Sequence, residues 1–322
     1  MAKKKQHKKV LSQRIEAEGV VIRSTATTNI KVRTPANEQY DCVLKGKFRI
    51  KGLKSTNPVA VGDEVKFYLP EAAGELGVVF KVMPRRNYIL RKAIAKTQHV
   101  HILCANIDQA ILLFTLEQPQ TSTGFADRFL ITAEAYHIPP IIIFNKIDLL
   151  TSSEQQTKLK ELSSLFTDIG YEVLHLAALD PQYRAIVSDL LKDKVSFIGG
   201  HSGAGKSTLI NLIDPQLDIK TATVSDYSHK GRHTTTYAEM HPLLEGGYII
   251  DSPGIRELGI VHFEKNDLSH YFPEMRERLS DCKFNDCKHL TEPHCAIKIA
   301  VEEGDIHPSR YESYVKLLEE VG

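Results

Sequence analysis

The sequence lacks any apolar run long enough to cross a membrane, and its first residues do not have the pattern of a secretory signal. A bilayer span needs about 20 consecutive apolar residues, whereas the longest apolar stretches, such as residues 138–144, are much shorter. The basic N-terminus is not followed by the apolar segment that a signal peptide requires. We therefore expect a cytoplasmic protein that makes no contact with a membrane.

The chain also has almost no net charge, but its charge is unevenly distributed. The formal net charge is +1 at pH 7, while the first nine residues contain five lysines, at positions 3, 4, 5, 8 and 9. Such a run is typical of a solvated tail or of a segment that contacts phosphate groups. Both interpretations stay open.

Short runs rich in valine, isoleucine, phenylalanine and tyrosine follow this tail. They cover residues 18–23, 30–33, 40–44, 64–69 and 77–83, with turn-forming residues between them. Five short strands predict a small closed barrel, and an OB-fold is the first candidate because it offers a face for nucleic acid. Basic residues after the last strand, including Arg85 and Arg86, are candidates for RNA contacts.

From about residue 106 the pattern changes to alternating strands and helices. Strands are predicted at 107–116, 141–144, 171–176 and 195–198, and helices at 125–136, 159–166, 183–191 and 207–213. This alternation predicts a doubly wound α/β domain. Nucleotides bind such domains at the carboxyl ends of the parallel strands.

A phosphate-binding motif directly follows the last of these strands. Residues 200–207 read GHSGAGKS and fit G-x-x-x-x-G-K-[ST] at every fixed position, between an apolar strand and a helix. The backbone amides of such a loop bind phosphate, the lysine reaches the β and γ phosphates, and the serine hydroxyl binds Mg²⁺. The predicted nucleotide contacts here are Gly200, His201, Ser202, Gly203, Ala204, Gly205, Lys206, Ser207 and Thr208.

A second motif, N-K-x-D, follows the strand at 141–144. It consists of Asn145, Lys146 and Asp148. The Asp148 carboxylate can accept hydrogen bonds from both N1–H and the 2-amino group of guanine, whereas adenine offers neither donor. The motif therefore predicts binding of GTP and GDP and disfavours an ATPase or a nucleotide kinase.

Two more segments complete the predicted phosphate site. An apolar strand ends in D-x-P-G, where Asp251 can hold a water bound to Mg²⁺ and the Gly254 N–H can meet the γ-phosphate. Upstream, a threonine-rich stretch can become ordered when a hydroxyl group reaches the magnesium ion. We predict that Thr235 does so, together with Ser207, and Thr234 is the second choice.

The order of the motifs is unusual. An ordinary GTPase runs from the phosphate-binding loop through the switch threonine and D-x-x-G to N-K-x-D, whereas here N-K-x-D comes first. This order predicts a circular permutation. The rearrangement is tolerable because domain termini usually lie close together at the surface, so joining them preserves the sheet.

A cluster of potential metal ligands lies near the C-terminus. Cys282, Cys287, His289 and Cys295 form C-x4-C-x-H-x5-C, and the chain has only two other cysteines. Three thiolates and one imidazole are the ligand set of a structural zinc ion, and a redox or catalytic cysteine is the alternative. Helices are predicted at 271–279 and 311–321, and positive charge nearby comes from Lys283, Lys288, His294, Lys298 and Arg310.

Together, the permuted order, GHSGAGKS, GRHTTT, DSPG and the cysteine cluster resemble the RsgA (YjeQ/YloQ) family of GTPases that depend on the small ribosomal subunit. The resemblance covers residues 16–321. It implies a basic tail at 1–14, an OB-fold at 15–85, a permuted GTPase domain at 90–258 and a zinc domain at 259–322. It further implies a monomer with one structural zinc ion, Mg²⁺ bound with GTP, and a role in late maturation of the 30S subunit through 16S rRNA.

Two positions depart from the pattern of ordinary GTPases. Where a serine and an alanine usually contact the base, the chain has two alanines, and we expect the backbone N–H of Ala178 to reach the guanine oxygen. Ile255 stands where many GTPases have a glutamine that orients the attacking water. We therefore expect slow hydrolysis until the 30S subunit activates it, with His262 as the catalytic candidate and His233 as the second choice. A GTP-dependent RNA-binding protein with negligible hydrolysis is the competing interpretation.

Overall fold

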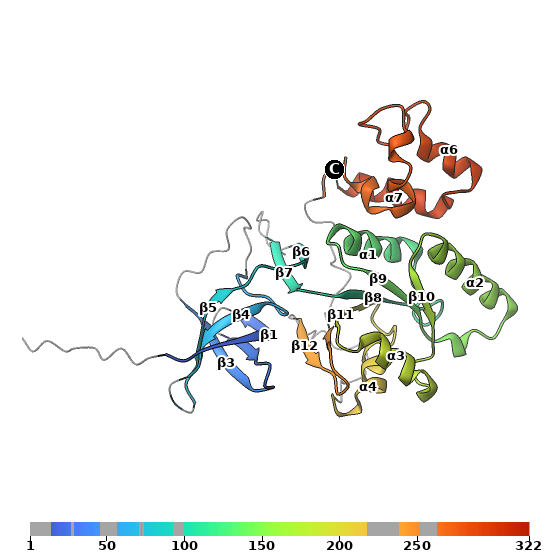
Figure 1. The fold of residues 1–322 in the computed structure, drawn as a ribbon. Helices are drawn as coiled ribbons and strands as arrows, with labels where there is room; N and C mark the ends of the chain where they lie inside the picture. The colour runs from blue at the N-terminus through green and yellow to red at the C-terminus, as the bar shows by residue number, and fades with distance from the viewer. Residues whose placement is uncertain are drawn as a thin grey trace, which may run out of the picture.

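A computed structural model describes residues 14–26, 29–45, 57–70, 72, 74–92, 100–217, 238–251 and 263–321. The catalytic candidates Thr235 and His262, their alternatives Thr234 and His233, and the predicted contact Gly254 lie outside these ranges. Figure 1 shows a β-barrel, a central α/β sheet with helices on both faces, and a helical C-terminal part above helix α1. This arrangement confirms the predicted fold class.

The first five strands form a closed barrel. They are β1 (Glu16–Ala26), β2 (Asn29–Arg33), β3 (Gln39–Leu44), β4 (Glu64–Tyr68) and β5 (Gly77–Val82). The strands pair in the order β1-β2-β3-β5-β4, and β4 pairs back with β1. The predicted OB-like barrel is confirmed, because alternate residues such as Val32, Phe67 and Val79 fill its interior.

A hairpin that the sequence pattern did not predict follows the barrel. It consists of β6 (Tyr88–Lys92) and β7 (Val100–Ala105), which pair antiparallel to each other. Its inner side chains Ile89 and Cys104 are buried in the core under α1. The hairpin therefore continues the hydrophobic core from the barrel to the α/β sheet.

The central sheet has the strand order β10-β9-β8-β11-β13-β12. Its strands are β8 (Gln109–Phe114), β9 (Pro140–Phe144), β10 (Glu172–His175), β11 (Val195–Gly200), β12 (Glu239–Pro242) and β13 (Tyr248–Asp251). All neighbouring pairs are parallel except β12 with β13. The predicted doubly wound sheet is confirmed, with β12 as an additional strand.

Four helices cover the two faces of this sheet (Figure 1). Helices α1 (Thr123–Ala135) and α2 (Ser153–Asp168) pack on one face, and α3 (Arg184–Leu191) and α4 (Lys206–Ile213) on the other. Successive residues of a strand point to opposite faces, so Leu112 packs under α1 while Ile111 packs under α3 and α4. Both faces are therefore apolar, as a parallel sheet requires.

The barrel and the central sheet are joined by backbone pairing. Strand β1 pairs antiparallel with β12, with Arg23 opposite Glu239, so one eleven-stranded sheet runs through both parts. Strand β12 leads directly into β13, which ends at Asp251. The barrel is thus attached to a strand that borders the predicted nucleotide site.

The C-terminal part consists of short helices around its own core. They are η6 (Leu268–Tyr271), α5 (Pro273–Arg276), η7 (Leu279–Asp281), α6 (Ala296–Glu303) and α7 (Pro308–Glu320). The single helix predicted at 271–279 is wrong, because α5 is only one turn long and starts at Pro273. Helix α7 confirms the prediction at 311–321. Among the described residues, no helix is both long and apolar enough to span a membrane.

Arg85, one of the predicted candidates for RNA contacts, is instead part of a buried ion pair. Its guanidinium donates to both carboxylate oxygens of Asp63, over 2.6 and 2.7 Å. The Asp63 side chain is fully buried, and it also accepts from the Ala60 N–H at 2.8 Å. Arg85 therefore fixes the turn before β4 and is unavailable to RNA.

Replacing Arg85 with methionine should strongly destabilise the fold. The change leaves the buried Asp63 carboxylate without its cation, which costs about 3–5 kcal/mol of unfolding free energy. Urea unfolding measures the loss. The matched control is Lys66→Met, because the ion pair of Lys66 with Glu18 is largely accessible to solvent, with side chains 34% and 69% exposed, and its loss should change stability little. Equal unfolding curves for the two variants would contradict this account.

Candidate nucleotide-binding site and metal centre

The predicted nucleotide contacts gather at one edge of the central sheet. Strands β8, β9, β11 and β13 are parallel, so their carboxyl ends lie along the same edge. Asn145 directly follows β9. The phosphate-binding loop begins at Gly200, the last residue of β11, and Asp251 is the last residue of β13. The topology therefore brings together three motifs that are far apart in the sequence.

The loop at 200–207 connects β11 to α4. Gly205 is the N-cap of α4 and has a left-handed backbone conformation, with φ 102°. The Lys206 ammonium donates to the carbonyl oxygens of Gly200 and His201, at 2.9 and 3.0 Å. Ser207 and Thr208 lie in the first turn of the helix, where backbone amides and the helix dipole favour an anion.

Two glycines of this loop cannot be replaced without a clash. At Gly200, with φ 149°, an added Cβ would lie 2.8 Å from the Leu113 carbonyl oxygen. At Gly205 it would lie 2.3 Å from the side-chain nitrogen of Asn145. The glycines thus allow the loop to approach β8 and the N-K-x-D segment closely.

The buried side chain of Asn145 links three loops. Its Nδ2 donates to the carbonyl oxygen of Ala204 at 2.7 Å, and its Oδ1 accepts from the Ala178 N–H at 3.0 Å. The Asn145 N–H donates to the Phe114 carbonyl oxygen at 2.8 Å. Asn145 therefore holds the phosphate-binding loop, the N-K-x-D segment and the alanine segment in one arrangement.

The loop between β8 and α1 supports the N-K-x-D segment. The sequence did not indicate this contact. The backbone of Lys146 has a left-handed conformation, and its ammonium donates to the Gln118 carbonyl oxygen at 2.5 Å. Partial burial lowers the pKa of Lys146. Glu117 accepts from Gln155 Nε2 at 3.3 Å, next to the cap of α2. A backbone acceptor leaves no sequence signal, because any residue type supplies a carbonyl oxygen.

The structure describes only some of the remaining predicted site residues. Asp148 lies in a short 3₁₀ turn after Lys146 and is exposed, so its carboxylate is open to a base. Asp251 is the last residue of β13, beside Ile198 of β11. The residues Thr235, Gly254 and His262 lie outside the described part of the chain.

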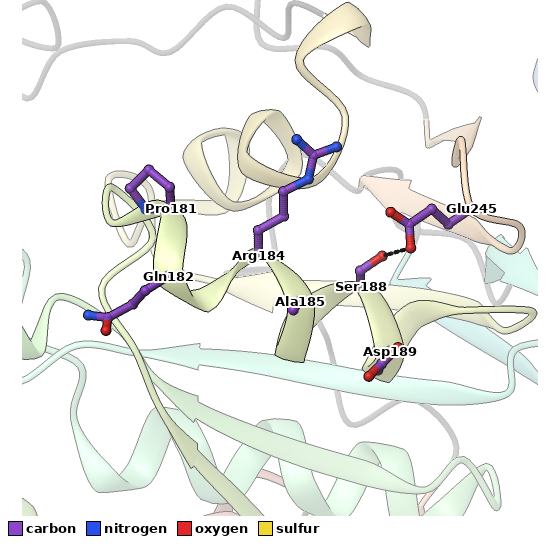
Figure 2. Close-up of a pocket in the computed structure, with 7 residues that line it drawn as sticks. All are labelled: Pro181, Gln182, Arg184, Ala185, Ser188, Asp189 and Glu245. Atoms are coloured by element: carbon purple, nitrogen blue, oxygen red, sulfur yellow. Dashed lines mark hydrogen bonds between the residues drawn. The ribbon is translucent and has the colours of Figure 1, made fainter.

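A cavity of about 340 Å³ lies over α3 (Figure 2) and contains none of the predicted nucleotide contacts. Its lining residues are Pro181, Gln182, Arg184, Ala185, Ser188, Asp189 and Glu245. The Ser188 hydroxyl donates to Glu245 at 2.6 Å. Two carboxylates beside a single arginine disfavour a phosphate group, so this cavity is not the nucleotide site.

The predicted metal ligands lie close together in the C-terminal part. One ligand atom from each of Cys282, Cys287, His289 and Cys295 lies within 4.8 Å of all the others. His289 Nδ1 lies 3.6 Å from Cys282 Sγ and 3.3 Å from Cys295 Sγ. Ligands on a tetrahedral zinc ion are about 3.8 Å apart. The four side chains therefore fit a tetrahedral metal ion.

The chemistry of the four donors also fits a cation. Burial lowers the pKa of His289, which keeps its imidazole in the neutral form that binds metals. Burial raises the pKa of the Cys287 thiol to about 12, so a thiolate at neutral pH requires a cation among the sulfur atoms. All five cysteines of the chain are free of disulfide bonds.

The turn that carries His289 is anchored on both sides. The Glu292 carboxylate accepts from the N–H groups of Lys288, Leu290 and Thr291 at 2.9–3.0 Å. From α7, the Tyr311 hydroxyl donates to the His289 carbonyl oxygen at 2.7 Å, and that of Tyr314 to the Lys288 carbonyl oxygen at 2.9 Å. The ligand loop and α7 therefore form one unit.

Comparisons with known proteins agree with this geometry. The family model "RsgA GTPase" matches residues 82–261. The small ribosomal subunit biogenesis GTPase RsgA of Christiangramia forsetii is 47% identical over 303 residues, covering 94% of this chain and 96% of that protein. Its counterpart in Bacteroides fragilis is 44% identical over 303 residues, covering 94% and 96%.

Two solved structures resemble the whole chain. The crystal structure of YjeQ from Thermotoga maritima superposes with a TM-score of 0.76 at 33% identity, covering 95% of this chain and 99% of that one. YloQ, described as a circularly permuted GTPase, superposes with a TM-score of 0.73 at 29% identity, covering 99% and 98%. The chain therefore belongs to the RsgA GTPase family.

Proposed function

We propose that this protein hydrolyses GTP and acts in the late assembly of the small ribosomal subunit. The observation that carries the nucleotide part is the buried Asn145 side chain, which joins the base-reading segment to the phosphate-binding loop. The subunit part rests on the names of relatives that match nearly the whole chain. We further infer a monomer that works in the cytoplasm, where ribosomal subunits are assembled.

Each segment of the site has a separate task in this proposal. The loop amides and Lys206 bind the phosphates, and Asp148 reads the guanine edge. In this structure the Ala178 N–H donates to Asn145 Oδ1, so the predicted bond to the guanine oxygen would require that N–H to be shared. Ser207 and Thr235 would hold Mg²⁺, and Asp251 a water bound to it. When bound, the magnesium ion neutralises phosphate charge, and the protein orients the γ-phosphate towards water.

The parts of the chain on either side of the GTPase domain are proposed to contact 16S rRNA. We divide the chain into a tail at 1–14, an RNA-binding barrel at 15–85, the GTPase domain at 90–258 and a zinc domain at 259–322. Lys45 of the barrel and Arg14, the last residue of the tail, lie over the ring of Tyr68, at 5.6 and 5.5 Å. Exposed cations beside an aromatic ring suit an RNA surface.

The 30S subunit should strongly stimulate GTP hydrolysis. Ile255 cannot orient water, so the free protein lacks part of the machinery until the subunit docks. Phosphate release over many turnovers, with and without purified 30S subunits, measures the effect, and 50S subunits are the control. If the subunit binds only the GTP form and hydrolysis stays negligible, the protein is an RNA-binding switch and the enzymatic proposal fails.

His262 is our candidate for positioning the attacking water in that stimulated state. His262→Ala should keep GTP and 30S binding. Its stimulated hydrolysis rate should fall about 100-fold, because the variant loses the imidazole that can accept a hydrogen bond from water. The exposed His270 provides the matched control, His270→Ala. A His262→Ala enzyme that is fully stimulated would exclude His262 and favour His233.

Asp148→Asn should weaken GDP binding about tenfold or more. The change turns one carboxylate acceptor into an amide donor that faces the guanine amino group, and a charge-assisted bond contributes about 1.5–3 kcal/mol. Titration calorimetry with GDP measures the loss. Asp168→Asn, at the exposed end of α2, is the control. Unchanged GDP affinity in Asp148→Asn would refute the assignment of this motif.

The metal proposed at the cysteine cluster is zinc, one ion per chain. Three thiolates and an imidazole favour zinc, and its binding contributes directly to folding of so small a part. Elemental analysis of protein purified without chelator should find one zinc, and chelation should unfold residues 263–321 while GDP still binds. Protein that is folded in this region and free of metal would contradict the proposal.

A further inference from the structure

Helix α1 contacts both the phosphate-binding loop and the C-terminal part. It follows the loop that supports Lys146, and it lies between the central sheet and α7 (Figure 1). Its inner residues, such as Phe129 and Leu130, pack on the sheet, whereas Ile131 belongs to the C-terminal core. The two cores therefore meet on opposite sides of one helix.

The first turn of α1 touches the phosphate-binding loop through stacked rings. The Phe125 ring lies on the imidazole of His201, with centroids 4.0 Å apart and an angle of 27° between the planes. The Ser122 hydroxyl caps the helix and accepts from the Phe125 N–H at 3.2 Å. The position of His201 in the loop is thus tied to the position of the helix.

The other side of α1 is bound to the C-terminal part by a buried ion triad. Arg310 of α7 donates to Asp127 of α1 at 2.5 Å and to the two carboxylate oxygens of Glu274 at 2.6 and 3.2 Å. Its guanidinium also lies 4.7 Å from the centre of the Phe272 ring. Arg310, expected to supply positive charge near the cysteine cluster, is fully buried, and the two carboxylates balance its charge.

Two further ion pairs attach α1 to the same part of the chain. Arg128 donates to both carboxylate oxygens of Glu320, at 2.6 Å each, and Glu134 accepts from Arg276 at 3.1 Å. These pairs are partly exposed and contribute less than the triad. The attachment nevertheless extends from Asp127 in the second turn of α1 to Glu134 in its last turn.

We propose that Phe125 and Arg310 are positioning residues for the nucleotide. Arg310 fixes α1 to the C-terminal part, and Phe125 fixes the phosphate-binding loop to α1 through His201. A displacement of the C-terminal part then changes nucleotide affinity, and nucleotide binding resists that displacement by the same free energy. This inference rests on the nucleotide site proposed above, and it gives subunit docking a route to that site.

The first test measures the dissociation rate of a fluorescent GDP analogue. Phe125→Leu removes the ring stack while keeping an apolar side chain, and it should speed dissociation about two- to tenfold, the contribution of an aromatic pair. Phe125→Tyr restores the ring and should restore the slow rate. Phe284→Leu, at an exposed ring in the C-terminal part, is the control. A wild-type rate in Phe125→Leu would overturn the role of Phe125.

The second test concerns Arg310. Arg310→Met alone leaves two buried carboxylates unpaired and threatens folding, so it is combined with Asp127→Leu and Glu274→Leu, which fill the site with apolar groups. This triple variant should release GDP faster than the wild type. Lys316→Ala removes an exposed ion pair with Glu312 that involves neither α1 nor the triad, and it should have no effect.

The two variants are then combined in a double-mutant cycle. If α1 carries the effect, Phe125→Leu should change the dissociation rate less in the triple variant than in the wild type, because the helix is already released. Equal effects in both backgrounds, or a wild-type rate in the triple variant, would overturn the linkage. Failure of the wild-type protein to bind GDP would refute the proposed function together with this inference.

Discussion

The side-chain amide of Asn145 determines the geometry of the nucleotide site. A buried amide must satisfy both its donor and its acceptor, and here the partners are the Ala204 carbonyl oxygen and the Ala178 N–H. Both partners lie in other loops, and Gly205 is close enough that even a Cβ would collide with the amide. The site therefore depends on contacts between loops at the ends of parallel strands and not on the order of the loops along the chain. That independence is why a permuted sequence can keep a working site.

The same principle of contact across long sequence distances connects the three parts of the molecule. The barrel joins the central sheet through β1 and β12, and the C-terminal part joins it through Arg310 and Asp127. Both connections lead to elements at the nucleotide site, β12 through β13 and Asp127 through α1. In the proposed role, a contact made by the barrel or by the C-terminal part would reach the nucleotide site through packed secondary structure.

Local features of the sequence were sufficient for the motifs, whereas contacts between distant segments were not. The phosphate-binding loop, N-K-x-D and the cysteine cluster each combine residue types with a fixed spacing, and the structure brings each set together. The Phe125–His201 stack and the Gln118 carbonyl contact have no comparable signal. In the sequence alone, Arg310 resembles an ordinary surface residue of a helix. It is buried because the topology brings Asp127, 183 positions earlier in the chain, against it. Helix 271–279 was mispredicted because Pro273 starts a separate turn there.

The most direct test of the central claim is the relative affinity of the unliganded protein for GDP and ADP, measured by titration calorimetry at one Mg²⁺ concentration. If Asn145 and Asp148 form a guanine-reading site, GDP should bind with one site per chain. ADP should bind at least about a hundredfold more weakly, because adenine offers neither of the two donors that the Asp148 carboxylate accepts from guanine. Comparable affinities for the two nucleotides would contradict the account, since the arrangement around Asn145 would then have no role in reading the base.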